Sequence, residues 1–233
     1  MIFIRAALLS LGLEFSAGAG ITQDFQKGMA AAQKGDYATA LKEFQVLAEQ
    51  GDNLAQYELG IMYNFGLGVP KNSEKATDLY RLSAVGGYGD AQTTLGLLYD
   101  RGEGVKQDYF EAEKWYFLAA KQGNIGGQYN LAVLHDFGLL GTVDFGEAVK
   151  WYLKAAEQGD GQAQYNLGAK YYNGEGTNKD LSRAFVWFWA AESQGVMNAS
   201  QARVSTEKQL TAAEKSSAQE IAVECIKKKY KDC

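Results

Sequence analysis

Hydrophobic and small residues along this chain recur at a fixed interval of 36 residues. A leucine followed by a small residue marks the register, and alanines and aromatic rings keep the same spacing further along. The recurring positions are Leu59, Leu95, Leu131 and Leu167; Ala76, Ala112, Ala148 and Ala184; Tyr80, Tyr116, Tyr152 and Phe188. Because no insertion or deletion interrupts four successive units, the pattern predicts a repeat protein whose core grows unit by unit.

Each unit is predicted to contain two helices, called helix A and helix B below. In the first unit, Ala55 and Leu59 follow the spacing of one apolar helical face, and Gly66 supplies the residue type that ends helices. Helix B begins after Asn72, whose short polar side chain can accept the free amide hydrogens of a first turn. Equivalent positions in the other units hold Asp36, Asp108, Asp144 and Asp180.

The stretch AVKWYLKAAEQGD, residues 148–160, shows what helix B is for. Ala148, Tyr152, Ala155 and Ala156 share one helical face, on which small residues allow a close approach and the ring fills the space beside them. We interpret this as a packing face and not as a cofactor site. The predicted fold is all-α, a right-handed α-solenoid of stacked antiparallel helix pairs.

Residues 163–195 read AQYNLGAKYYNGEGTNKDLSRAFVWFWAAESQG. This pattern closely resembles the Sel-one-like repeat family, relatives of tetratricopeptide repeats with a longer loop between the helices. The resemblance implies a non-catalytic adaptor role in assembly, signalling, envelope function or host interaction. Leu140 replaces the second loop glycine of the third unit, so a less regular loop is expected over residues 139–143.

The register divides the chain into segments. Residues upstream of the regular units form another helix pair with a shorter loop, and Thr211 with Glu214 has the spacing of a capping box in a more polar closing helix. The predicted segments are 1–19, a signal peptide; 20–52, a tetratricopeptide-like pair; 53–88, 89–124, 125–160 and 161–196, four repeats; and 197–233, capping helices.

The first residues, MIFIRAALLSLGLEFSAGAG, resemble a secretory leader cleaved after about Ala19. Arg5 precedes a short apolar run, although Glu14 is unusual in such a segment. A retained anchor and an unstructured cytosolic leader are the alternatives. We expect a soluble, periplasmic or secreted mature protein with no transmembrane segment.

The charge of −5 at pH 7 makes nucleic acid an unfavourable partner. Cys225 and Cys233 would lie about 12 Å apart on a continuous helix. A disulfide between them therefore requires the helix to stop near Lys229 and the chain to turn back. The disulfide is our interpretation, with two free thiols as the alternative, and two cysteines without a nearby histidine make a poor metal site.

Residues for catalysis are few. His135, the one histidine, occupies a position that tyrosine fills in other units, which indicates packing and not a general base. Ser205 and Lys208 match Ser-x-x-Lys, but the companion motifs of penicillin-binding enzymes are absent. We predict no enzyme activity, no cofactor and no metal.

The side of helix A opposite its helix B remains as the candidate binding surface, on the concave side of a solenoid. Its tyrosines could instead pack between neighbouring repeats. We expect a monomer that binds another protein or an extended peptide, with a basic segment favoured. Muropeptide or β-lactam binding with weak β-lactamase-like activity, by a cell-wall-associated protein, is the alternative function. The candidate residues are Tyr57, Asn64, Asp100, Tyr129, Asp136, Tyr165 and Tyr172.

Overall fold

The computed structural model describes residues 23–231 and 233, so the predicted leader lies outside the described residues. Over that part of the chain all regular structure is α-helical, which confirms the predicted class. None of the helices in residues 23–231 combines the length and the apolar character needed to cross a membrane.

The helices follow one another through two compact units, which divide after Leu95 within α6. The first unit holds α2 (Gln23–Gln33), α3 (Tyr37–Glu49), α4 (Asn53–Phe65), α5 (Ser73–Val85) and the start of α6 (Gly89–Arg101). The second holds the rest of α6 with α7 (Tyr109–Lys121), α8 (Ile125–Asp136), α9 (Phe145–Glu157), α10 (Gly161–Asn173), α11 (Leu181–Ser193), α12 (Ala199–Glu207) and α13 (Ala212–Lys227).

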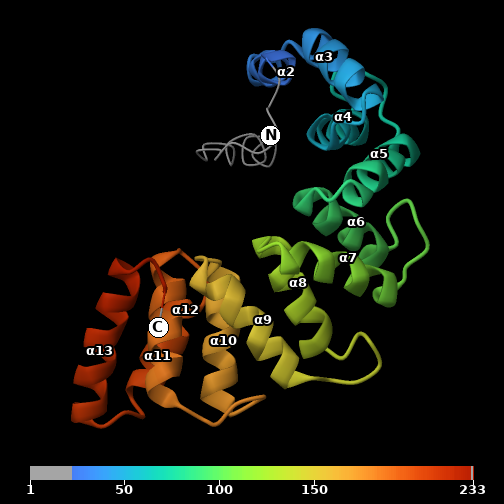
Figure 1. The fold of residues 1–233 in the computed structure, drawn as a ribbon. Coiled ribbons are helices and arrows are strands. Elements are labelled where there is room, and N and C mark those ends of the chain that lie inside the picture. The colour runs from blue at the N-terminus through green and yellow to red at the C-terminus, as the bar shows by residue number, and fades with distance from the viewer. Residues whose placement is uncertain (1–22, 232) are drawn as a thin grey trace. The chain divides into compact units, whose positions relative to one another are not determined.

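Consecutive helices pack against each other inside each unit, as the colour order of Figure 1 lets the reader follow. In the first unit α2 packs on α3, α3 on α4, and α4 on α5. In the second unit the same succession runs from α7 to α11, and α11 contacts both α12 and α13. This succession of stacked helix pairs is the arrangement that the 36-residue period predicts.

Short polar side chains begin the helices as expected. Asn72 accepts the amide hydrogen of Lys75, and Asp144 accepts that of Glu147. Thr211 and Glu214 form the predicted capping box at the start of α13. Left-handed glycines follow the helices at the predicted register positions, since α4 and α10 end at Gly66 and Gly174 and Gly138 follows Phe137 at the end of α8.

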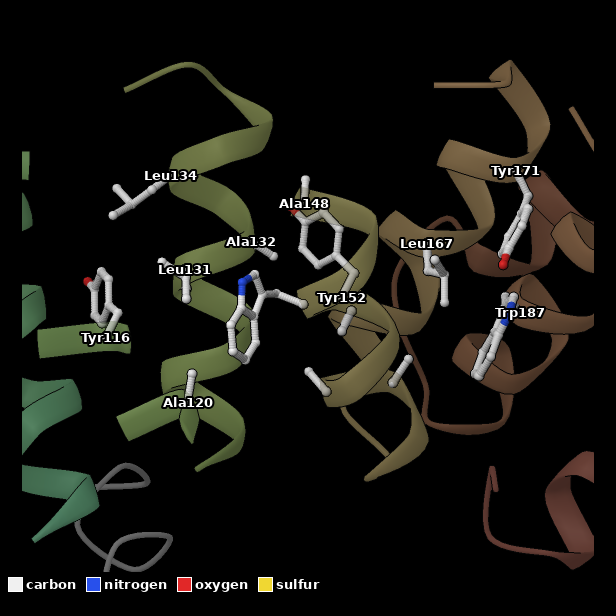
Figure 2. Packing of buried hydrophobic residues seen from close by; sticks show 14 of the residues in the cluster. Tyr116, Ala120, Leu131, Ala132, Leu134, Ala148, Tyr152, Leu167, Tyr171 and Trp187 are labelled. Carbon is white, nitrogen blue, oxygen red and sulfur yellow. The ribbon is translucent and has the colours of Figure 1, made fainter. Parts of the chain in front are cut away.

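The core of the second unit alternates rings with small residues, as Figure 2 shows around Ala132 and Tyr152. Tyr152, Ala148, Ala155 and Ala156 are fully buried, which confirms the packing face predicted for residues 148–156. Trp187 on α11 is also buried in this cluster. Each helix B therefore contributes a ring that neighbouring helices cover.

A repeated hydrogen bond joins each helix A to the end of the preceding helix B. A buried glutamine in the first turn of helix A donates through Nε2 to an alanine carbonyl eight residues earlier. The pairs are Gln56 to Ala48 at 3.3 Å, Gln92 to Ala84 at 3.1 Å, Gln128 to Ala120 at 3.3 Å and Gln164 to Ala156 at 3.1 Å. Each of these carbonyls also accepts the amide hydrogen of the glycine three residues later, so the glutamine supplies a second hydrogen bond that joins the two helices.

Glycine on helix A lets the ring of its own helix B approach closely. A Cβ at residue 168 would lie 2.8 Å from Cδ1 of Phe188, and one at residue 96 would lie 2.6 Å from the Tyr116 ring. Gly60 has the same relation to Tyr80.

Gly168→Val is expected to lower the free energy of unfolding by about 1–3 kcal/mol, because the added atoms overpack a buried ring. Gly146→Val is the matched control, since a Cβ there meets only the Asp144 carboxylate at 3.3 Å. Urea denaturation of both variants measures the difference. Equal stability of the two would contradict the close ring contact.

The chain turns back after α13 and closes a disulfide between Cys225 and Cys233, with Cα atoms 5.2 Å apart. Lys229 and Tyr230 both adopt left-handed backbone conformations, which make the reversal. Tyr230 then lies against Ser193 and Gln194 at the end of α11. The disulfide thus fixes a short C-terminal segment on the last regular repeat.

Candidate partner-binding surface

The seven candidate residues lie on helix A of their repeats, and the helix-A surface is defined here, within the second unit, as the side of α8, α10 and the end of α6 that carries five of them. All seven residues are partly exposed as whole residues, but the Asp136 side chain is only 10% exposed. The first unit contains Tyr57 and Asn64, both on α4. The second unit contains the other five: Asp100 on α6, Tyr129 and Asp136 on α8, and Tyr165 and Tyr172 on α10.

Tyr57 packs between consecutive repeats. Its ring centroid lies 5.5 Å from that of Tyr80 and 5.1 Å from that of Tyr88, and its hydroxyl is 3.4 Å from the Thr94 hydroxyl. Burial raises the pKa of Tyr57 to about 12. Tyr57 therefore packs between neighbouring repeats, which was the alternative to partner binding for these tyrosines.

The tyrosines of the second unit are held on one side in a similar way. Tyr129 lies 5.9 Å from Tyr152 and Tyr165 lies 5.5 Å from Phe188, measured between ring centroids. The Tyr172 hydroxyl accepts a hydrogen bond from Gln209 Nε2 at 2.6 Å. Each side chain is fixed by a neighbour and still partly exposed, so these are rigid aromatic positions.

The two aspartates bind the tyrosines of their own helix pairs. Tyr116 donates its hydroxyl hydrogen to Asp100 at 3.2 Å, and Tyr152 donates to Asp136 at 3.1 Å. Burial, followed by the adjacent carboxylate charge, raises the pKa of both hydroxyls above their ordinary value. Both tyrosines therefore stay protonated as donors, and the carboxylates are oriented from within the fold.

Lys170 is a buried charged residue on α10 that the sequence analysis did not identify. Its ammonium group forms ion pairs with Asp136 and, at 2.8 Å, with Glu175, and it lies 4.2 Å from the ring centroid of Phe145. The side chain is 8% exposed and that of Asp136 is 10% exposed, so this charge pair is internal. The signal was a lysine where the other three repeats have Met62, Leu98 and Leu134.

The candidate catalytic residues are not assembled into a site. His135 is mostly buried, with Nε2 3.8 Å from the Glu113 carboxylate. Ser205 and Lys208 are both exposed, and within residues 23–231 no hydrogen bond joins their side chains. The part of the chain that the structure describes contains no cluster of three or more His, Cys, Asp or Glu side chains that could hold a metal ion.

The Sel1 repeat family model matches residues 5–30, 53–88, 89–124, 126–160 and 161–196. The last four segments coincide with the predicted repeats to within one residue, whereas the first overlaps the predicted leader and reaches into α2. Residues 31–52 lie outside the matched segments.

Solved structures show the same relationship. A Sel1 repeat protein from Oxalobacter formigenes is 30% identical with a TM-score of 0.73, over 89% of this chain and 85% of that one. The protein c5321, described as a protective antigen of uropathogenic Escherichia coli with an SLR fold, is 25% identical with a TM-score of 0.50, over 91% of this chain and 62% of that one. Sel1 repeat proteins generally act as non-catalytic scaffolds for protein–protein interaction. The stacked helix pairs, the 36-residue register and these matches together show that the chain belongs to the Sel1 repeat family.

Proposed function

We propose that this chain is a non-catalytic, exported scaffold that binds an extended peptide segment of another protein through the helix-A surface. The observation that carries the proposal is the row of rigid, partly exposed tyrosines on α8 and α10, formed by Tyr129, Tyr165 and Tyr172.

Rigid tyrosines suit this task because binding orders them at little entropic cost. Each ring offers apolar area and a polar hydroxyl, the combination enriched among residues that dominate binding energy at interfaces. Since a neighbour already fixes one side of each ring, few rotamers are lost when a partner covers the other side.

Charge favours a basic partner segment. The chain carries −5 at pH 7, and Asp100 accepts a hydrogen bond from Tyr116. A carboxylate has more acceptor positions than one hydroxyl uses, so Asp100 retains the capacity to bind a donor of the partner.

Two features support export to the periplasm or the cell exterior. The first residues resemble a cleavable leader, and the disulfide between Cys225 and Cys233 suits an oxidising compartment. Fractionation of cells producing the full chain, with N-terminal sequencing of the product, tests this part. Recovery of an unprocessed product in the cytosol would contradict it.

Site-specific photo-crosslinking tests the surface. A photoreactive phenylalanine at position 165 or 172 is expected to crosslink the same partner protein in the native compartment. The matched control position is Phe117, an exposed ring on α7. Partner crosslinks at 117 and none at 165 or 172 would reject the helix-A surface.

The same preparation tests the alternative function. Crosslinks to peptidoglycan fragments in place of a protein would favour the cell-wall-binding interpretation. Nitrocefin turnover that Ser205→Ala abolishes would contradict the non-catalytic part of the proposal.

A further inference from the structure

The C-terminal segment shows what kind of side chain the end of a helix B accepts. Gln194 Nε2, at the end of α11, donates a hydrogen bond to the Tyr230 hydroxyl, and the Ser193 hydroxyl lies 3.4 Å from it. Ser193 donates its own hydrogen to the Ala190 carbonyl at 2.6 Å, so the Tyr230 hydroxyl is the donor toward Ser193. A glutamine and the residue before it thus give a tyrosine hydroxyl one donor and one acceptor.

A glycine leaves room for the tyrosine ring. A Cβ at Gly159, which follows α9, would lie 3.3 Å from Cε2 of Tyr230. The equivalent glycine 36 residues earlier is Gly123, where a Cβ would meet no atom of the described residues within 4 Å, its chain neighbours aside. The ring position is therefore filled at the last regular repeat and open at the repeat before it.

A pocket lies at this earlier position. The counterparts of Ser193 and Gln194 there are Glu157 and Gln158, at the end of α9. Both line a surface pocket of about 440 Å³, called the edge pocket below. The residues that line the edge pocket are Gln128, Lys154, Glu157, Gln158 and Lys231.

Contacts connect the edge pocket both to the open glycine and to the C-terminal segment. Gln128 donates to the Ala120 carbonyl, which also accepts the amide hydrogen of Gly123, so the open glycine lies beside the pocket. Lys231 follows Tyr230 directly in the chain. The pocket therefore adjoins the segment that fills the later position.

Gln158 has a hydrogen to offer a ligand. Its Nε2 donates to Gln128 Oε1 at 2.7 Å and to the Lys154 carbonyl at 3.4 Å. The second bond is long, so a ligand hydroxyl could replace it without disturbing the first. At the filled position, the amide of Gln194 serves the tyrosine, and Gln164 Oε1, the counterpart of Gln128 Oε1, has no hydrogen-bond partner within the described residues. This glutamine can therefore donate to a tyrosine hydroxyl.

Glu157 supplies the acceptor. A carboxylate accepts a hydroxyl hydrogen in a charge-assisted bond, which is stronger than a bond between neutral groups. An ammonium group or an aliphatic side chain cannot accept that hydrogen. The other two regular repeats carry such residues at these positions, Lys121 with Gln122 and Val85 with Gly86. Among the four regular repeats, the one that ends at Gln158 thus combines an acceptor and a donor with an open ring position.

We propose that the edge pocket binds a tyrosine side chain of a partner protein, which extends the proposed scaffold function to a second surface. Gln158 donates to the phenol oxygen, Glu157 accepts the phenol hydrogen, and the ring lies against Gly123. The stems of Lys154 and Lys231 supply apolar walls while their ammonium groups stay in water. Phenylalanine lacks the hydroxyl, and the phosphate of phosphotyrosine is repelled by the Glu157 carboxylate.

The test uses the full chain with its disulfide intact and Nα-acetyl-tyrosine amide as the probe, with NMR as the readout. Saturable shifts of the Gln158 side-chain amide and the Gly123 backbone amide are expected. The phenylalanine analogue of the probe is expected to bind roughly tenfold more weakly, because it forms neither hydrogen bond. Equal binding of the two probes would overturn the pocket.

Two variants locate the binding groups, with the Gly123 signal as the readout. Gln158→Met and Glu157→Lys are each expected to weaken binding of the tyrosine probe roughly tenfold. Gln50→Met is the matched control, since Gln50 has the same register position in the first unit and should not affect the signal. Equal weakening by Gln158→Met and Gln50→Met would overturn the site. Tighter binding of the phosphotyrosine analogue would also overturn it, because the lysines and not Glu157 would then decide the specificity.

The outcome separates the edge pocket from the helix-A surface, because the titration needs no native partner. If the probe fails to bind while crosslinks at positions 165 and 172 persist, the edge pocket is wrong and the scaffold proposal stands. If the probe binds and those crosslinks are absent, the helix-A surface is wrong and the edge pocket stands.

Discussion

Lys170→Met is expected to lower the free energy of unfolding by about 3 kcal/mol, because it leaves the buried Asp136 carboxylate without its counter-ion. Within residues 23–231, Asp136 would then retain the hydrogen bond from Tyr152 and no ion pair. Methionine fills most of the lysine volume and occupies the equivalent position 62, so the loss reflects charge and not packing. Urea denaturation at pH 7 measures the change.

The double variant Asp136→Asn with Lys170→Met provides the control. Removal of both charges should recover much of the lost stability, since a well-packed neutral pair costs less than one buried charge. Simple additivity of the two single effects would show that the ion pair contributes no coupling. Stability unchanged in Lys170→Met would contradict the burial of this pair.

Much of the fold could be predicted because stacking imposes its period on the sequence. Each helix B needs a ring and small residues on the face that its neighbours cover, and each start needs a side chain such as Asn72 or Asp144 to accept free amides. These requirements recur in every unit and are local. The arrangement of consecutive pairs follows from them without knowledge of any long-range contact.

Contacts between side chains were less predictable. A helical projection places Tyr129 and Tyr165 on the side of helix A that faces away from helix B. It could not show that the rings of Tyr152 and Phe188 on helix B contact one side of each. The hydrogen bond between Tyr152 and Asp136 links positions 16 residues apart on two helices, so it depends on how the pair closes. Contacts of this kind do not appear as a repeated pattern in the sequence.

Two signals were present and were missed. Glutamine recurs in register with the leucines, which indicates a conserved geometric task within this chain, here the hydrogen bond to the preceding helix B. Lys170 interrupts a series of apolar residues, and a charged residue at a core position requires a buried partner. Departures from the repeat pattern therefore deserve as much weight as the pattern itself.

Glu58 and Asp136 present the same physical problem with different solutions. Both are poorly exposed carboxyl groups on a helix A. Lys170 supplies a positive charge to Asp136, whereas no ion pair reaches Glu58 within the described residues. Since the fold leaves one carboxyl uncompensated, its ionisation should cost stability.

The first unit is accordingly expected to lose stability as the pH rises from about 4.5 to about 7. Burial, assisted by the nearby charge of Asp90, raises the pKa of Glu58 to about 7 from 4.5. Between these values the folded chain holds a proton that the unfolded chain has released, so rising pH favours unfolding. The loss is complete above the folded pKa and amounts to about 3 kcal/mol.

Amide hydrogen exchange of α4 and α5 at pH 5 and pH 8 measures this effect locally, as the opening free energy of each amide. Glu58→Gln is expected to remove most of the difference between the two pH values and to stabilise α4 at pH 8. Glu74→Gln, at an exposed position, should leave the difference in place. An identical pH dependence in wild type and Glu58→Gln would mean that water or a group outside the described residues compensates the carboxylate, and it would contradict the predicted cost of ionising Glu58.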